Sequence, residues 1–110
     1  MARKSRNPGL SDFGRFSEPA LLILISLASG PKHGYAMIED IESVAGVRLG
    51  PGTLYGAISR LESRGLIEAL EPDNRRNPYQ LTGAGELSLR ERLENLAAVA
   101  RAGARRLARA

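Results

Sequence analysis

The 110-residue sequence contains no cysteine, no tryptophan and only one histidine. The lack of cysteine excludes disulfides, thiol nucleophiles and cysteine-ligated zinc, and it fits a reducing compartment. A single histidine without an obvious partner is a poor basis for catalysis or metal binding. The carboxylates are spread over outer helix faces, and no phosphate loop of the Walker or dinucleotide type occurs. We therefore expect no enzyme, no cofactor and no metal site.

Long hydrophobic runs are also missing. The longest apolar stretch, Ala20 to Ala28, is interrupted by Ser26 and is far shorter than the roughly 20 residues of a membrane helix. The N-terminus shows neither a signal-peptide pattern nor a lipidation motif. These absences predict a cytoplasmic protein that has no membrane partner.

What the sequence does contain is positive charge and enough apolar residues for one core. The formal net charge is +4, and the sequence pI is about 10.1. A hydrophobic fraction of 43% in 110 residues allows one compact core and no second domain. The charge favours an anionic partner such as nucleic acid, although small basic proteins without such partners are common.

Residues 1–16 have the composition of a basic arm. Their cationic side chains are Arg3, Lys4, Arg6 and Arg15, against the single acid Asp12. Proline and glycine interrupt any sustained period, so we expect a mobile segment. Such an arm either contacts DNA phosphates or a minor groove, or it remains a solvated tail.

Two helices are expected next. Ser17 is placed to cap the first, which is apolar on every side and ends near Gly30, as is typical of a helix buried in the core. The second is expected over residues 34–45 and ends at Gly46. Its expected inner face comprises Tyr35, Ile38, Ile41 and Val44. For His33, which precedes it, we favour hydrogen bonding to the free N–H groups of the helix over contact with a phosphate.

Residues 50–65 predict a third helix with two different faces. Pro51 suits the first helical position and Gly65 the left-handed end. The apolar stripe consists of Leu54, Ala57, Ile58 and Leu61, and the candidate DNA-reading surface consists of Gly52, Thr53, Tyr55, Gly56, Ser59 and Arg60. Short polar side chains would let the backbone approach base edges in a major groove. The alternative is an ordinary amphipathic helix with a small outer face.

A β-hairpin is expected after the third helix. Residues 66–71 and 78–82 predict two strands around a segment rich in turn formers. Pro78 restricts its strand to an edge or to a position without a hydrogen bond. Arg75 and Arg76 at the tip are suited to contact the DNA backbone or minor groove, and the alternative is a solvated turn.

Residues 83–110 predict one long helix, capped by Thr82 and opened by small residues that permit close packing. A heptad seam runs along it, formed by Leu89, Leu93, Leu96, Ala100, Gly103 and Leu107. The helix extends beyond what one small domain can cover, so we expect it to form a homodimer interface. The alternative is that it folds back on its own domain.

Together these elements predict a mainly α fold with a small β-hairpin. Residues 17–82 form the winged helix-turn-helix, and 83–110 form the dimerisation helix. A resemblance to a known family rests on four segments: Leu27–Tyr35 with its HGY motif, Pro51–Tyr55 (PGTLY), Arg60–Glu62 with Gly65–Ile67, and Tyr79–Thr82 with Gly85. In these segments the chain resembles the PadR family of bacterial transcriptional regulators. Gly50 and Gly56 depart from the family pattern, which often has Ser and Pro there.

The resemblance implies a homodimer that binds an inverted-repeat operator in double-stranded DNA and usually represses transcription. It also implies that a small-molecule effector can relieve the repression. Because tryptophan is absent, the aromatic stacking pocket of the drug-binding members cannot be carried over. The alternative function is that of a winged-helix adaptor, which binds a protein partner and has no sequence-specific DNA binding.

Overall fold

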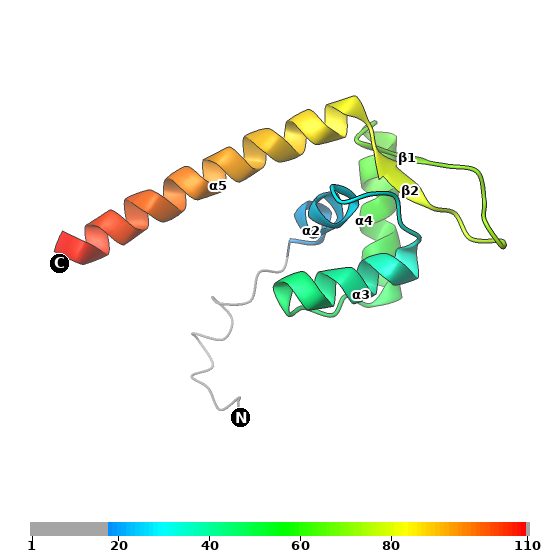
Figure 1. The fold of residues 1–110 in the computed structure, drawn as a ribbon, viewed down its shortest axis with the longest axis horizontal. Coiled ribbons are helices and arrows are strands. Elements are labelled where there is room, and N and C mark those ends of the chain that lie inside the picture. Colours follow the sequence, from blue (N-terminus) through cyan, green and yellow to red (C-terminus); the bar gives the residue numbers. More distant parts are fainter. Residues whose placement is uncertain (1–17, 110) are drawn as a thin grey trace, which may run out of the picture.

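The structure is a computed structural model that describes residues 18–109, so the expected basic arm and Ser17 lie outside the described residues. Its elements are α2 (Pro19–Leu27), α3 (Gly34–Ala45), α4 (Pro51–Ser63), β1 (Ile67–Ala69), β2 (Tyr79–Leu81) and α5 (Gly83–Arg109). Helices α2, α3 and α4 form the body, and the hairpin and the end of α5 lie at opposite ends of the molecule (Figure 1). The mainly α winged-helix fold predicted from the sequence is confirmed.

Helix α2 is the centre of the core, as expected. It contacts α3, α4, α5 and β2. Its fully covered residues are Leu21, Leu22, Ile23, Leu24, Ser26 and Leu27. Glu18 precedes the helix as N-cap and makes no side-chain capping bond. Since every side of α2 is covered, its sequence needs no amphipathic period.

Helix α3 has the expected bounds, and Gly46 ends it with a left-handed φ of 71°. The expected inner face was wrong for Tyr35 and Val44, which are 60% and 64% exposed. Tyr35 lies about 160° around the helix from the buried Met37, at 3.6 residues per turn. Val44 is in the last turn, where it only borders a small hollow at the end of α2.

A polar network joins the end of α2 to α3. The buried Ser26 donates a hydrogen bond from Oγ to Oδ2 of Asp40, 2.7 Å away. Lys32 donates to the backbone oxygen of Ser26 at 2.5 Å and to Oγ of Ser29 at 2.7 Å. The network fixes the segment between the two helices, and this segment in turn holds the wing.

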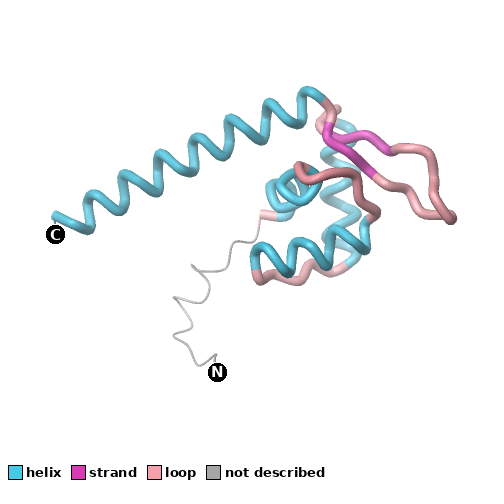
Figure 2. Tube along the Cα trace, in the orientation of Figure 1, coloured by secondary structure: helices cyan, strands magenta, loops and turns pink. Residues whose placement is uncertain are grey.

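The wing is a two-stranded antiparallel hairpin with Ile67 opposite Leu81 and Ala69 opposite Tyr79. Its strands are shorter than expected, because Pro72 and Pro78 have no N–H to donate to the ladder. At the tip, Asp73 and Arg76 exchange two backbone hydrogen bonds of 2.7 and 2.9 Å. Figure 2 shows how much of the hairpin beyond the strands is loop.

Backbone hydrogen bonds attach the wing to the helices. The N–H of Lys32 donates to the oxygen of Tyr79 at 3.1 Å, and the N–H of Tyr79 donates to the oxygen of Lys32 at 2.9 Å. A residue between α2 and α3 thereby pairs with β2 as a single-residue third strand. The position of the wing relative to α3 is set by this pair.

Helix α5 begins as the sequence indicates. Thr82 accepts a hydrogen bond from the N–H of Gly85 at 3.0 Å and donates to the oxygen of Gly65 at 2.6 Å. Only Gly85 and Leu89 are buried within the helix, and Arg92 forms a 2.8 Å ion pair with Glu18. The rest of α5 leaves the body (Figure 1). Among residues 18–109, no helix has both the length and the apolar character needed to cross a bilayer.

Candidate nucleic-acid interface

The orientation of α4 is fixed by its apolar stripe. Leu54, Ala57, Ile58 and Leu61 are all buried, with exposed fractions of 4% or less. The opposite face is turned to solvent, with Gly52, Thr53, Ser59 and Arg60 exposed and Gly56 half-buried. Within residues 18–109, nothing therefore covers the exposed part of the predicted surface.

Within the described residues, packing does not require glycine at positions 52 and 56. A β-carbon on Gly52 would meet no described atom within 4 Å, and one on Gly56 would meet only Nη1 of Arg60, at 3.7 Å. Residues 18–109 would therefore accept larger side chains at both positions. The lack of side chains leaves a flat strip of backbone on the outer face of α4.

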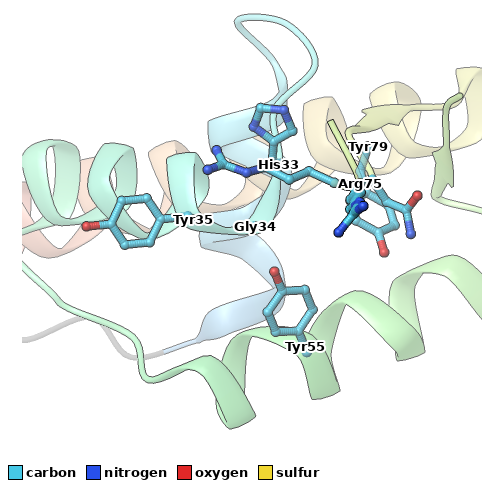
Figure 3. Close-up of a pocket in the computed structure, with 8 residues that line it drawn as sticks. His33, Gly34, Tyr35, Tyr55, Arg75 and Tyr79 are labelled. Carbon is cyan, nitrogen blue, oxygen red and sulfur yellow. The ribbon is translucent and has the colours of Figure 1, made fainter. Parts of the chain in front are cut away.

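Tyr55 belongs only partly to this outer face. Its side chain is 49% exposed, and its ring points toward the backbone of Gly34 at the start of α3 (Figure 3). A β-carbon on Gly34 would lie 2.6 Å from Cζ of Tyr55 and nearer still to its hydroxyl. This contact between α3 and α4 was not apparent from the sequence, because it joins two motifs that are 21 positions apart.

The wing and the two helices enclose a pocket of about 460 Å³. It is lined by His33, Gly34, Tyr35, Tyr55, Arg75, Arg76, Asn77 and Tyr79. Figure 3 shows that the labelled members come from the start of α3, from α4 and from the wing, and that the Tyr35 ring is directed away from Tyr55 and Tyr79. The structure thus brings the two wing arginines, assigned from the sequence, to the same place as Tyr55. Tyr79 and Asn77 were not predicted as site residues from the sequence. Tyr79 is brought to the pocket by its backbone pairing with Lys32, and a single pairing of this kind leaves no periodic pattern in the sequence.

His33 does not have the structural role that we favoured. It is the N-cap residue of α3 with an extended backbone, and its side chain makes no capping hydrogen bond. The N–H groups of the first turn therefore receive no bond from this imidazole. The ring lines the pocket instead.

Two electrostatic effects bear on this surface. On the face of α3 that also carries Tyr35, Arg48 lies 2.6 Å from Glu42 and 3.6 Å from Glu39, and the hydrogen bond and charge of Glu42 raise the pKa of Arg48. In the pocket, burial raises the pKa of Tyr79, and the nearby Glu62 and Tyr55 add to the shift. The Tyr79 hydroxyl is therefore protonated at neutral pH and can donate a hydrogen bond.

The candidate dimer seam on α5 divides into two parts. Leu89 is 5% exposed and belongs to the core of its own domain, so it is not part of a free seam. Leu93, Leu96 and Leu107 are 42%, 38% and 79% exposed, and Ala100 and Gly103 lie between them on the same face. A groove of about 310 Å³ borders the base of this face, lined in part by Ala28, Leu81 and Leu93.

Comparisons with known proteins agree on one family. The model of the transcriptional regulator PadR-like family matches residues 23–91. An uncharacterized 37.1 kDa protein in transposon Tn4556 of Streptomyces fradiae is 46% identical over 83 residues, which cover 76% of this chain. The matched part is 24% of that relative, so the chain spans about a quarter of its length.

Solved structures share the fold. A PadR family transcription regulator from Clostridium difficile superposes with a TM-score of 0.73 at 23% identity, covering 81% of this chain and 97% of that one. A transcriptional regulator from Clostridium thermocellum has a TM-score of 0.68 at 25% identity, covering 76% and 86%. Since the family model matches more than half of the chain, the protein belongs to the transcriptional regulator PadR-like family.

Proposed function

We propose that this regulator binds an inverted-repeat operator as a homodimer and represses transcription, with α4 entering the major groove of each half-site. The observation that carries the proposal is the orientation of α4. Its apolar stripe is buried in the core, while its small polar face is covered by nothing in residues 18–109. A helix that presents few donors and little bulk can come close to base edges.

The proposed contacts have different roles. Gly52 and Gly56 allow close approach, since the described part of the chain leaves the space beside them open. Thr53, Ser59 and Arg60 supply donors along the exposed face, and Tyr55 lies at its edge. Arg75 and Arg76 at the wing tip would hold the flanking backbone or minor groove.

Charge supports the same assignment. From Pro51 to Leu61 the helix contains no acidic residue. The acidic residues Glu39 and Glu42 on the outer side of α3 are paired with Arg48. The surface offered to a polyanion by α4 and the wing tip is therefore neutral to positive, as electrostatic attraction to phosphates requires.

A second copy of the chain is the proposed cover of the α5 seam. The free part of the seam comprises Leu93, Leu96, Ala100, Gly103 and Leu107. Helix α5 has 27 residues and is thus about 40 Å long, at 1.5 Å per residue. Two copies paired along this face would be related by a two-fold axis. Their α4 helices would then read half-sites about 10 base pairs apart, or a multiple of that distance.

Relief of repression by a small molecule belongs to the same proposal. The groove beside Leu89 and Leu93 adjoins both the domain core and the start of the free seam. A ligand that wedges into this groove would change the angle between α5 and the domain. In a dimer, that angle sets the distance between the two α4 helices.

A mobility-shift titration with the DNA upstream of the protein's own gene tests the function. We expect a discrete complex that survives excess random-sequence competitor, with Ser59→Ala and Arg60→Ala variants losing the preference for this DNA. A protein that binds no duplex at low salt would contradict the proposal and favour the winged-helix adaptor. Equal affinity for all duplexes would exclude sequence-specific regulation.

A further inference from the structure

The pocket between α4, α3 and the wing has the chemistry of an anion site. Two arginines and a histidine line it, and none of its eight lining residues is acidic. Tyr55, Tyr79 and Asn77 add neutral hydrogen-bond donors, whereas the ring of Tyr35 is directed away from them (Figure 3). Outside the lining, the charge of Glu62 contributes to the raised pKa of Tyr79. A site built from donors and positive charge favours an anion with several acceptor oxygens.

The pocket also receives the start of α3. Gly34 and Tyr35, the first two residues of this helix, line it. The first turn of α3 contains no acidic residue, and His33 does not cap it. Its free N–H groups therefore add to the positive potential of the arginines.

The walls of the pocket differ in how firmly they are held. Tyr79 is fixed by its backbone pair with Lys32, and Tyr55 by its contact with Gly34. Arg75 lies in the exposed two-residue turn at the wing tip and the exposed Arg76 directly follows it, so their side chains can adjust to a ligand. Rigid hydroxyl groups facing adaptable guanidinium groups are suited to closing on a ligand from two sides.

The position of the pocket identifies the ligand. In a duplex, the major groove and the neighbouring minor groove are separated by one sugar-phosphate strand. If α4 lies in the major groove and the wing lies over the adjoining one, that strand must cross the space between them. The pocket occupies this space, with α4 on one side and the wing on the other (Figure 3).

We propose that this pocket binds one phosphate of the DNA backbone, held jointly by Tyr55 of α4, His33 at the start of α3 and the wing arginines. The inference rests on the proposed function and deepens it. It assigns the Tyr55 hydroxyl to a contact with the DNA backbone rather than with a base. It gives His33 a contact with the ligand, and it makes the wing and α4 parts of one site. Such a contact would set the register of α4 along the groove.

Binding of a random-sequence duplex about two helical turns long tests the site by fluorescence anisotropy over a range of salt. Tyr55→Phe keeps the ring against Gly34 and removes only the hydroxyl, so we expect normal folding and about tenfold weaker binding. Its log–log salt slope should stay unchanged, because no charge is lost. Arg75→Ala should lower the slope by about one phosphate contact. Arg101→Ala, which removes the same charge from exposed α5, is the matched control.

The outcomes separate the two proposals. A wild-type protein that binds no duplex overturns the function itself. Duplex binding that is equally strong in wild type and Tyr55→Phe overturns the phosphate site and leaves the function standing. The same conclusion follows if Arg75→Ala and Arg101→Ala change the slope equally.

The single histidine provides a direct readout of the ligand. The imidazole NMR signals of His33 are the only ones of this type in the chain. We expect them to shift on addition of the duplex and to respond less to the duplex in the Arg75→Ala variant. Inorganic phosphate serves as the soluble competitor. If it saturates the site at low concentration and displaces the duplex, the pocket belongs to a soluble phosphorylated ligand and the backbone assignment is wrong.

Discussion

The ring of Tyr55 packs against the backbone of Gly34, with its hydroxyl in the place that a β-carbon on residue 34 would take. The two residues lie in the two motifs on which the family resemblance rests, HGY and PGTLY. Glycine at one position and tyrosine at the other are thus parts of one contact. This contact joins the start of α3 to α4, next to the outer face of α4.

Replacing Gly34 by Ala should destabilise the protein through this contact. The new methyl group would collide with the half-exposed end of the Tyr55 side chain, which must swing away. We expect a loss of about 1 to 2 kcal/mol in the free energy of unfolding, as for other overpacked sites, together with weaker DNA binding. Urea denaturation and anisotropy measure the two effects.

The control for this substitution is the same Gly34→Ala change made in a Tyr55→Leu background. In a Tyr55→Leu background the added methyl group meets no phenol, so Gly34→Ala should cost little or become favourable, because Ala is the better helix former. If Gly34→Ala costs the same in both backgrounds, the contact between the two residues contributes nothing to the effect.

A second glycine is crowded by backbone, which cannot move aside. A β-carbon on Gly85 would lie 2.9 Å from the carbonyl carbon of Leu66 and nearer still to its oxygen. Gly85→Ala should therefore push α5 away from Leu66, which directly precedes β1, and cost about 3 kcal/mol, at the upper end for overpacking. Gly83→Ala is the matched control, since the space beside Gly83 is open and α5 begins there. Thermal unfolding measures the stability of both variants, and we expect Gly85→Ala to have the lower melting temperature. Equal melting temperatures would contradict the packing argument.

Local signals predicted the element bounds well. Gly46 and Gly65 have the left-handed φ values of 71° and 75° that their places at helix ends suggested. Thr82 makes the expected cap of α5. These features depend on a few neighbouring residues, so one sequence is enough to predict them. The apolar stripe of α4 is equally local, because helical period alone places its residues on one side.

The errors concern what covers a residue. Tyr35 and Val44 were assigned inward by spacing, yet no element of the described chain lies over them. Leu89 fits the heptad seam, but α5 crosses the domain at that point and buries it. The pocket around His33 depends on the pairing of Lys32 with Tyr79, 47 positions apart. Period and composition do not encode such long-range contacts.

The wing tip offers a test that separates stability from DNA binding. Asn74 and Arg75 have φ values of 51° and 66°, the arrangement of a two-residue hairpin turn that favours glycine at its second position. Arg75→Gly should relieve a left-handed arginine and stabilise the protein by about 0.5 kcal/mol, after the greater flexibility of glycine in the unfolded chain is subtracted. DNA binding should nevertheless weaken, because one phosphate contact is lost. Melting temperature and affinity would therefore move in opposite directions, and a parallel fall of both would show that Arg75 stabilises the turn.

Two leucines on opposite faces of α5 provide a test of the proposed dimer and its matched control. Leu96 lies in the free seam and Leu87 on the opposite face, and they are 38% and 57% exposed, so neither is needed for the core. Leu96→Glu would place two carboxylates at the dimer contact, and we expect a folded monomer by sedimentation equilibrium. Its operator affinity should fall by at least about 100-fold, because the two half-sites are no longer bound by one molecule. Leu87→Glu adds the same charge to the same helix and should leave both the mass of the dimer in solution and the operator affinity unchanged.

A Leu96→Glu protein that stays dimeric would place the interface elsewhere. Dissociation of both variants would mean that α5 pairs through a different face.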